Sequence, residues 1–272
     1  MKVSCTTLAC PNWSLETILE RFKEYGYDGL DFRGLGDEMQ LWKLEAFSTK
    51  AEATAKRIAD VGLEVTGFSS GARLYNPDPA DVEAALEEVR QYARLCHIFS
   101  APMIRVFGGR HRGAPWNEVL ATAVETLRKM AEIAGKGITI ALETHDDFIE
   151  SAKVAEVIAR TNAPNVGVLW DLHHPYRLAG ESPQQTYDNI GRYTVATHLK
   201  DSRTTGTGEE DYEYVLAGEG DVPLAEMVRL LKAGGYDGAI TLEWEKKWHP
   251  ELAEPEVALP HHARYIRQLI SQ

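Results

Sequence analysis

Short apolar runs of strand length alternate with longer amphipathic stretches along the whole chain, and this alternation limits the possible folds more than any other feature. The expected strands lie at 2–8, 29–33, 64–68, 103–107, 138–143, 166–171, 194–199 and 239–243. Strands that alternate with helices usually pair in parallel, because each helix carries the chain back to the same end of the sheet. The pattern therefore predicts an α/β fold with a parallel sheet covered by helices.

The stretches between these runs repeat apolar residues at steps of three and four, the period of a helix with one buried face. The expected helices lie at 15–25, 48–61, 80–96, 116–134, 149–160, 183–190, 223–232 and 256–270. The third is the clearest, because Val82, Leu86 and Val89 form an apolar stripe while Glu87 and Arg90 face water.

Eight such units in about 250 residues match a (β/α)8 TIM barrel, in which catalytic groups lie where the strands end. A doubly wound open sheet is the competing architecture. It usually has a Gly-rich turn after the first strand, and segment 5–11 contains no glycine. No Pro-rich, Ser-rich or low-complexity linker divides the chain, so we expect one barrel domain over residues 1–272.

The charge balance argues against a nucleic-acid partner. The chain has 29 Lys and Arg against 41 Asp and Glu, a formal net charge of −12 that would repel a phosphate backbone. The partner that we expect is a small-molecule sugar or polyol. Assembly into a homo-oligomer stays open.

Nothing in the sequence indicates a membrane span or a disulfide framework. The longest apolar runs fall far short of the roughly 20 residues that cross a bilayer, and the first residues enter a strand directly, so a cytoplasmic location is the default expectation. Cys5, Cys10 and Cys96 are odd in number and contain no C-x-x-C pair, which predicts free thiols.

Four expected strands in the second half each end in a side chain that can bind a metal ion. These are Glu143, Asp171, His198 and Glu243. The first three are about one βα unit apart, and segment 201–221 supplies the extra residues before the fourth. Strand alternation places each of them on the same face as a small or apolar residue two positions earlier, so all four can point at the barrel axis.

Three carboxylates that meet within about 5 Å repel by roughly 3 kcal/mol per pair at an effective dielectric of 20. A positive group among them removes that cost, and a divalent cation is the simplest choice. Three oxygen donors and one imidazole suit Mn²⁺, which we expect first, and also Mg²⁺, Co²⁺ or Zn²⁺.

The chain resembles the xylose isomerase-like TIM barrels, a family that includes sugar-phosphate isomerases and epimerases, ketose 3-epimerases and inosose-processing enzymes. The resemblance covers nearly the whole chain. It rests on GYDGLD at 26–31, IRVFGG at 104–109, GEGDVP at 218–223 and the quartet of Glu143, Asp171, His198 and Glu243. It implies a metal ion bound by the quartet, with Glu143 and Glu243 also acting as acid and base on opposite faces of the substrate.

Chemistry makes this double use reasonable. A metal ion that bridges a carbonyl and the neighbouring hydroxyl stabilises an enediolate, while one carboxylate removes a proton and another returns it. Return to the same carbon inverts a centre, and return to the neighbouring carbon moves the carbonyl. The sequence thus predicts a metal-dependent isomerase or epimerase of a polyhydroxy carbonyl compound.

Three further residues are candidate substrate contacts near the strand ends. His174 follows Asp171 by three residues and resembles a substrate-contacting histidine of the epimerase branch, the alternative being a loop histidine without a ligand. His145 shares the face of Glu143 and either orients a ligand or satisfies backbone groups. Lys200 extends the face of His198, where it either neutralises an oxyanion or points to the surface.

Three others complete the substrate-binding set. Arg105 on the fourth strand, if it points inward, needs an anionic substrate or a carboxylate partner such as Asp31. Arg203 lies close to the spacing of the family's substrate-binding arginine without matching it. Trp13 either stacks on a sugar or packs against the first helix.

The segment that precedes the last strand also allows two interpretations. Residues 201–221 are rich in Gly, Thr and acids, so they either close over the site or form a solvated connector. Gly218 and Gly220 lead into a helix start that can hold phosphate in barrels, although Asp221 has the wrong charge for it. Glu245 shares the face of Glu243 and fits the rim of the site better than the ligand set.

Three rival functions remain. An endonuclease IV-like nuclease would share the quartet and His174, but it needs further histidines where this chain has Asp211 and Glu213, and at the end of the third strand. A non-catalytic sugar-binding barrel is disfavoured because both Glu143 and Glu243 are present. A metal-dependent dehydratase of a cyclic polyol or dehydroshikimate-like acid would use the same enolisation and then expel a hydroxyl.

Overall fold

The computed structural model describes residues 1–206 and 211–272, and within them eight parallel strands close into a barrel. Around the barrel the strands follow the order β1-β10-β7-β6-β5-β4-β3-β2. Their bounds are Lys2–Thr6 (β1), Gly29–Phe32 (β2), Glu64–Arg73 (β3), Met103–Phe107 (β4), Thr139–Glu143 (β5), Val166–Asp171 (β6), Thr194–Leu199 (β7) and Ala239–Leu242 (β10). The predicted (β/α)8 TIM barrel in a single domain is confirmed.

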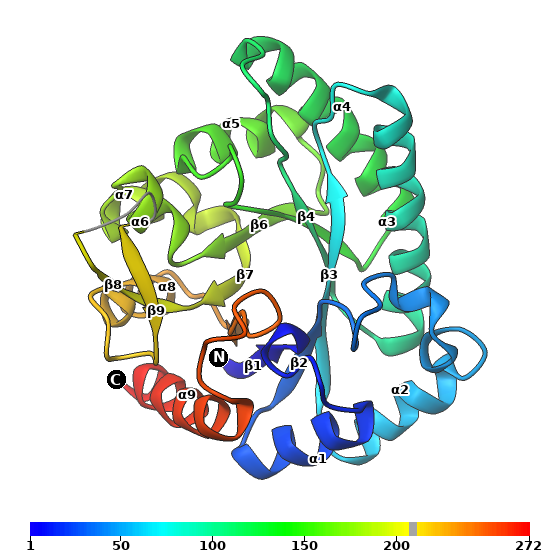
Figure 1. Ribbon diagram of the computed structural model, residues 1–272. Helices are drawn as coiled ribbons and strands as arrows, with labels where there is room; N and C mark the ends of the chain where they lie inside the picture. The colour runs from blue at the N-terminus through cyan, green and yellow to red at the C-terminus, as the bar shows by residue number, and fades with distance from the viewer. Residues whose placement is uncertain (207–210) are drawn as a thin grey trace.

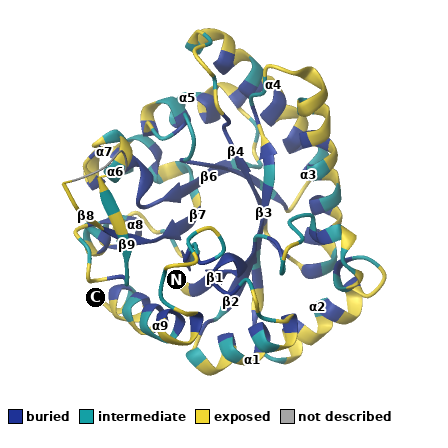
Figure 2. Cartoon of the chain, in the orientation of Figure 1, coloured by how far each residue is buried: buried dark blue, intermediate teal, exposed yellow. Residues whose placement is uncertain are grey.

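Helices surround the barrel (Figure 1), and their inner faces are buried while their outer faces are exposed (Figure 2). The helices are Leu15–Tyr25 (α1), Ala51–Asp60 (α2), Pro79–Phe99 (α3), Trp116–Ala134 (α4), Ser151–Thr161 (α5), His174–Ala179 (α6), Pro183–Ile190 (α7), Leu224–Ala233 (α8) and Pro255–Ser271 (α9). Short 3₁₀ turns occupy Thr7–Ala9, Leu41–Lys43, Glu45–Phe47 and Gly191–Tyr193. No helix of the described residues is long and apolar enough to cross a bilayer.

Local sequence signals explain where these helices begin and end. The side chain of Ser14 accepts a hydrogen bond from the amide of Thr17 at the start of α1, and Gly26 ends this helix with φ of 85°. At α3 the side chain of Asp78 accepts from the amide of Ala80, and Pro79 occupies the first turn, where its missing N–H costs nothing.

Segment 201–221 contains regular structure that its composition did not indicate, and whether it closes over the site stays a prediction. Asp201–Thr204 (β8) and Tyr212–Val215 (β9) pair as an antiparallel hairpin beside α6 (Figure 1). Within β9, Tyr212 and Tyr214 contact the ring of His173 at centroid distances of 4.9 and 5.5 Å. The part of the prediction that concerns residues 207–210 lies outside the described residues. The two tyrosines give the hairpin one face that packs against the barrel at His173. The Gly- and acid-rich composition of the segment did not indicate such a face.

Other boundaries move by a few residues. The first strand ends at Thr6 because a 3₁₀ turn follows it, and β3 runs on to Arg73. Helix α6 was not predicted, since His174–Ala179 is too short to show a helical period. Strand β10 ends at Leu242, which leaves Glu243 just beyond it.

The barrel interior shows the expected alternation of side chains. Met103, Ala141, Leu169 and Ala196 form a small buried apolar cluster of their own. The last three lie two positions before Glu143, Asp171 and His198, so they occupy the same strand faces one layer lower. This layer fills the barrel beneath the strand ends and leaves the polar groups at the top.

Buried His262 of α9 should make the barrel sensitive to mild acid. Its Nδ1 donates to the carbonyl of Ala258 at 2.6 Å and its Nε2 accepts from the amide of Ala217 at 3.2 Å, which fixes the neutral tautomer. Burial lowers the pKa of His262 from 6.5 to about 4. In the unfolded chain this histidine is protonated below about pH 6.5, whereas in the folded chain it is protonated only below about pH 4. The free energy of unfolding therefore falls as the pH falls from about 6.5 to about 4.

Between about pH 7 and pH 5 this single group should remove about 2 kcal/mol from the free energy of unfolding. Urea unfolding at the two pH values checks the expectation. His262→Gln does not titrate, so its stability should fall by about 2 kcal/mol less than that of the wild type over the same interval. An identical decline in both proteins would contradict the assignment.

Candidate active site

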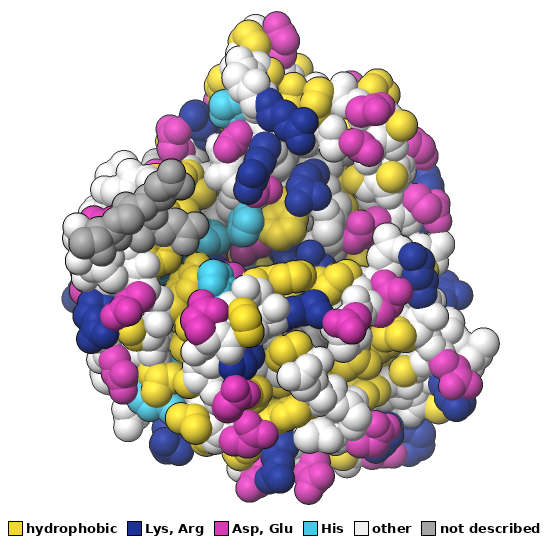
Figure 3. Space-filling model, in the orientation of Figure 1, with side chains coloured by type: hydrophobic (Ala, Val, Ile, Leu, Met, Phe, Trp, Pro, Cys, Tyr) yellow, Lys and Arg dark blue, Asp and Glu magenta, His cyan; other side chains and the backbone are white. Residues whose placement is uncertain are grey.

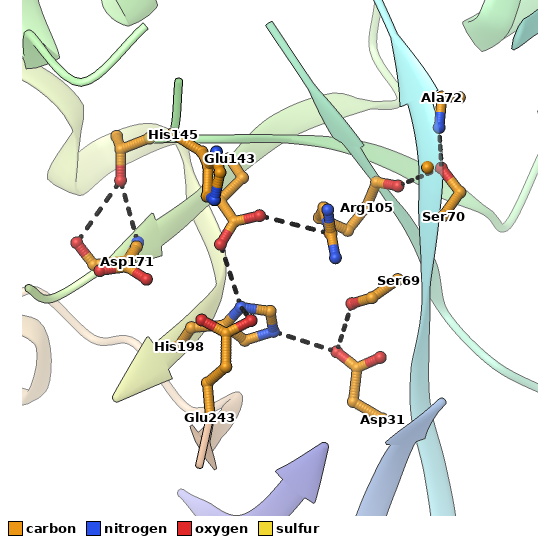
Figure 4. A network of polar contacts seen from close by, with 12 residues as sticks. Asp31, Ser69, Ser70, Ala72, Arg105, Glu143, His145, Asp171, His198 and Glu243 are labelled. Carbon is orange, nitrogen blue, oxygen red and sulfur yellow. Dashed lines mark hydrogen bonds and ion pairs between the residues drawn. The ribbon is translucent and has the colours of Figure 1, made fainter. Parts of the chain in front are cut away.

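The four side chains of the predicted quartet meet at the ends of four neighbouring strands. Glu143 ends β5, Asp171 ends β6, His198 lies on β7 and Glu243 follows β10, and these strands are adjacent around the barrel. One ligand atom from each lies within 4.8 Å of the other three, and all four residues are buried. Figure 4 shows them pointing at a common centre from separate strands.

His198 is the hub of this centre. Its Nδ1 lies 3.1 Å from a carboxylate oxygen of Glu143 and 3.1 Å from one of Glu243. Its Nε2 lies 3.3 Å from Oδ2 of Asp31, which also accepts a hydrogen bond from the hydroxyl of Ser69 at 3.0 Å (Figure 4). The imidazole therefore joins three carboxylates from three strands.

Asp31 belongs to this network although the sequence placed it only as a partner for Arg105. Arg105 instead pairs with Glu143, Nε to Oε2 at 3.3 Å, and both side chains are 1% exposed. The GYDGLD run places Asp31 on the second strand, one residue before β2 ends, and this acidic residue within a barrel strand was the signal that could have placed it beside the quartet. Asp31 and His198 are 167 residues apart in the sequence, so no local pattern could indicate their contact.

Lys200 places a positive charge among the carboxylates of the site. From the sequence we expected a divalent cation alone to offset their repulsion. The side chain of Lys200 is 1% exposed, and its ammonium lies 2.8 Å from Asp171, 2.5 Å from Glu243 and 2.9 Å from Glu245. Of the two alternatives for this residue, the structure excludes the surface-pointing lysine. Glu245 lies at the edge of the site and bonds Lys200, with 16% of its side chain exposed.

These contacts hold both catalytic candidates in their ionised form. Burial alone would raise the pKa of Glu143, but the charges of Arg105 and His198 outweigh it and lower that pKa. For Glu243 burial is likewise outweighed, mainly by Lys200 and then by His198, and the pKa falls well below its usual value. Both glutamates are therefore proton acceptors near neutral pH.

His198 and Lys200 stay protonated for the complementary reason. Burial would lower the pKa of His198, yet the carboxylates of Glu243 and Glu143 raise it well above its usual value. Burial would also lower the pKa of Lys200, but Asp171 and Glu243 hold it well above its normal range. A metal ligand must be neutral imidazole, so a cation bound here would release the proton of His198.

The donor set fits a single divalent ion. Ligand atoms on opposite sides of an ion at 2.0–2.4 Å lie about 4–5 Å apart, which agrees with the 4.8 Å limit for the quartet. Oε2 of Glu143 and Oδ2 of Asp171 are buried without a hydrogen bond, and each lies beside a cationic side chain, Arg105 at 3.3 Å and Lys200 at 2.8 Å. A bound cation would share these two oxygens with those side chains. Oxygen donors with one imidazole suit Mn²⁺, Mg²⁺, Co²⁺ or Zn²⁺.

Two histidines flank the quartet. His174 is buried, and its Nδ1 lies 3.0 Å from the carbonyl of Thr144. The ring of His145 is 4.8 Å from that of His174, and its side chain is 34% exposed. His173, which the sequence argument did not select, forms a second potential metal cluster with Asp171 and His174. Its signal was the repeated histidine after a strand-end aspartate.

The remaining candidates make their contacts elsewhere. Arg203 is 57% exposed and pairs with Glu213 on the neighbouring strand of the hairpin at 2.6 Å. Trp13 is half-buried and packs against the hydrophobic core. The amides of Gly218 and Gly220 donate to the carboxylate of Asp201 at 2.8 and 3.2 Å, so they are already engaged and offer no phosphate site.

Several curated proteins are similar to this chain in sequence. The inosose isomerase of Halalkalibacterium halodurans is 25% identical over 149 residues, which cover 52% of this chain and 51% of that protein. The fructoselysine 3-epimerase of Escherichia coli O157:H7 is 22% identical over 256 residues, which cover 89% of this chain and 90% of the relative. Two of the curated relatives are matched over only about half their length, 44% and 51%.

A crystal structure of the IOLI protein with a zinc atom bound superposes with a TM-score of 0.84 at 18% identity, covering 100% of this chain and 98% of the other. At that identity the likeness concerns the fold. The family model described as xylose isomerase-like TIM barrel matches residues 19–269. The chain therefore belongs to the xylose isomerase-like TIM barrel family.

Proposed function

We propose that this protein is a divalent-metal-dependent isomerase or epimerase of a sugar or related polyhydroxy carbonyl compound. One observation carries the proposal: Glu143 and Glu243 approach the same Nδ1 of His198 from different strands, each at 3.1 Å. Two carboxylates that flank one centre can remove and return a proton on a substrate held between them. The named isomerase and epimerase relatives agree with this chemistry.

The chain's own residues account for the proton transfers. Glu143 and Glu243 are both ionised, so either can accept the proton, and the glutamate that accepts it becomes the acid that can give it back. Arg105 beside Glu143 and Lys200 beside Glu243 fix the two carboxylates in place. We propose substrate contacts for His174, His145, Lys200 and Arg105, which lie in or beside the quartet.

The quartet of Glu143, Asp171, His198 and Glu243 would hold the cation, and we keep Mn²⁺ as the first choice. A bound cation would supply Lewis-acid stabilisation of negative charge on the substrate oxygens. Arg203 and Trp13 face other partners, and we propose no role for them in the proton transfers.

Removal of divalent cations should stop the reaction. After treatment with a chelator, uptake of deuterium from heavy water into a ketose or inosose substrate should fall by at least about a hundredfold. Added Mn²⁺ should restore it, and Mg²⁺, Co²⁺ and Zn²⁺ tested one at a time would rank the metals. Deuterium uptake that continues unchanged in metal-free protein would refute the metal dependence.

A metal-dependent dehydratase is the second candidate, and the position of His145 favours it. The ring of this histidine contacts Phe107 in a tilted arrangement and His174 edge-on, is partly exposed, and offers a third proton-transfer group beside Glu143. A dehydratase needs such a group to protonate a leaving hydroxyl. Product analysis separates the two candidates, because loss of water changes the mass of the product and isomerisation does not.

A small-molecule substrate, rather than nucleic acid, stays the predicted partner. A cytoplasmic location and a homo-oligomeric state also stay predictions.

A further inference from the structure

A basic pocket lies beside the candidate active site. This pocket, called here the arginine pocket, has a volume of about 360 Å³ and is lined by Arg73, Arg110, Arg112, Asp146, Tyr75 and two neighbouring loop residues. Its residues come from the end of β3 and from the loops that follow β4 and β5. Loops at the ends of barrel strands are where substrate specificity is built.

Backbone hydrogen bonds hold the segments around the arginine pocket in place. The amides of Leu74 and Tyr75 donate to the carbonyls of Phe107 and Gly108 at 2.9 and 3.0 Å, which joins the ends of β3 and β4. A Cβ at Gly109 would approach the carbonyl oxygen of Tyr75 to 2.4 Å, so this contact requires glycine. The pocket walls therefore keep a defined spacing.

The loop that carries Arg110 and Arg112 is also held by a hydrogen bond to a neighbouring loop. The amide of His111 donates to Asp147 at 2.8 Å, which joins this loop to the one after β5. Arg112 and Asp146 both adopt left-handed backbone conformations, with φ of 49° and 51°. For arginine this conformation costs energy, and residues held in this way are concentrated at functional sites.

The charge inside the arginine pocket is unbalanced. Three guanidinium groups face one carboxylate, Asp146, in a chain whose net charge is −12. Asp146 lies 3.9 Å from Nε of Arg73 and 3.6 Å from Nε of Arg110, beyond hydrogen-bonding distance. The side chain of Asp146 is 7% exposed, whereas those of Arg73 and Arg110 are 51% and 74% exposed. The guanidinium groups of Arg73 and Arg110 are thus largely exposed beside a buried carboxylate, and Nη1 of Arg73 donates to the carbonyl of Gly71 at 3.4 Å.

Phe107 and His145 connect the arginine pocket to the quartet. The guanidinium of Arg105 lies 3.8 Å from the centre of the Phe107 ring and that of Arg73 lies 5.7 Å from it. The ring of His145 also contacts the Phe107 ring, at a centroid distance of 4.5 Å and a tilt of 50°, and its Nδ1 is 3.3 Å from Asp146. In Figure 3 Lys and Arg side chains gather beside the central hollow of the face shown, close to histidines.

We propose that the arginine pocket binds an anionic group of the substrate, a carboxylate or a phosphate ester, while the polyhydroxylated carbonyl end reaches the quartet. Guanidinium groups suit both anions because their paired N–H donors match two oxygens at once. The inference rests on the proposed function and narrows it to acidic or phosphorylated substrates. A neutral sugar would leave at least two guanidinium charges without a partner.

Calorimetric binding of matched probes tests the inference without requiring turnover. Fructose and its terminal phosphate ester form one pair, and the methyl ester of shikimate and shikimate itself form the other. At least one charged probe should bind about tenfold more tightly than its uncharged twin, and Arg73→Gln with Arg110→Gln should abolish that preference. A preference within the fructose pair would indicate a phosphate ester as the bound group, and a preference within the shikimate pair would indicate a carboxylate.

A matched control replaces two arginines on outer helix surfaces, Arg94 on α3 and Arg229 on α8, both exposed. This variant has the same net charge as the pocket variant and should keep the preference. Equal binding of charged and uncharged twins, survival of the preference without Arg73 and Arg110, or failure of all four probes to bind would overturn the inference. Absence of deuterium uptake would instead refute the proposed function and leave the charge preference intact.

Discussion

Glu143→Gln should lower the rate of substrate deuterium exchange by about a thousandfold or more while the protein keeps its barrel fold. The amide keeps the size of the side chain but neither accepts the substrate proton nor offers a charged ligand to a cation. Circular dichroism should show an unchanged helix and strand content. The exchange rate at saturating substrate and metal concentrations measures the effect.

Glu181→Gln is the matched control, because Glu181 is another buried carboxylate, one that lies outside the site. It accepts hydrogen bonds from the amide and hydroxyl of Ser151 and from the hydroxyl of Thr186. Its replacement should lower stability and leave exchange within a few-fold of the wild type. Exchange at the wild-type rate in Glu143→Gln would remove Glu143 from the chemistry.

Lys200→Met should destabilise metal-free protein by about 3–5 kcal/mol, since it leaves the carboxylates of Asp171 and Glu243 buried without their nearest positive partner. Added Mn²⁺ should recover part of this loss, because a cation in the quartet would replace the missing charge and bind only the folded state. Urea unfolding with a chelator and with excess Mn²⁺ measures both effects.

Lys246→Met separates this effect from the loss of any buried lysine. The ammonium of Lys246 bonds the carbonyls of Pro250 and Leu252 and the carboxylate of Glu254, and its side chain is 8% exposed. Its replacement should destabilise the fold, and Mn²⁺ should recover no more than it adds to the wild type. Metal-free Lys200→Met as stable as the wild type would show that Lys200 is not the counter-charge we infer.

Sequence periodicity carried most of the information about where the site residues lie. Alternation along a strand put Ala141 beside Glu143 and Leu169 beside Asp171, and both apolar residues do occupy one cluster inside the barrel. The pairing of β8 with β9 was not predicted, because its sequence signal is only two tyrosines in a polar segment. Periodicity reports which face a side chain takes and leaves its partners across the barrel undefined.

The partners of Arg105 and Lys200 illustrate that limit. The sequence offered Asp31 as a partner for Arg105, whereas the structure pairs Arg105 with Glu143 on the neighbouring strand and Asp31 with His198. For Lys200 the choice between surface and interior was open, and three carboxylates from two strand ends decided it. Such contacts depend on the barrel register, which no local pattern specifies.

The sequence by itself determined the α/β class and the strand ends that carry the quartet, because local periodicity dictates which faces are buried, and eight units without a Gly-rich first turn favoured the closed barrel over an open sheet. Only the tertiary structure decided how charge is balanced, with Lys200, Arg105 and His198 set among the carboxylates, and it alone gathered the arginine pocket from three strand-end segments. The physical reason is that electrostatic energy depends on distances between side chains far apart in sequence, and those distances exist only once the barrel has closed.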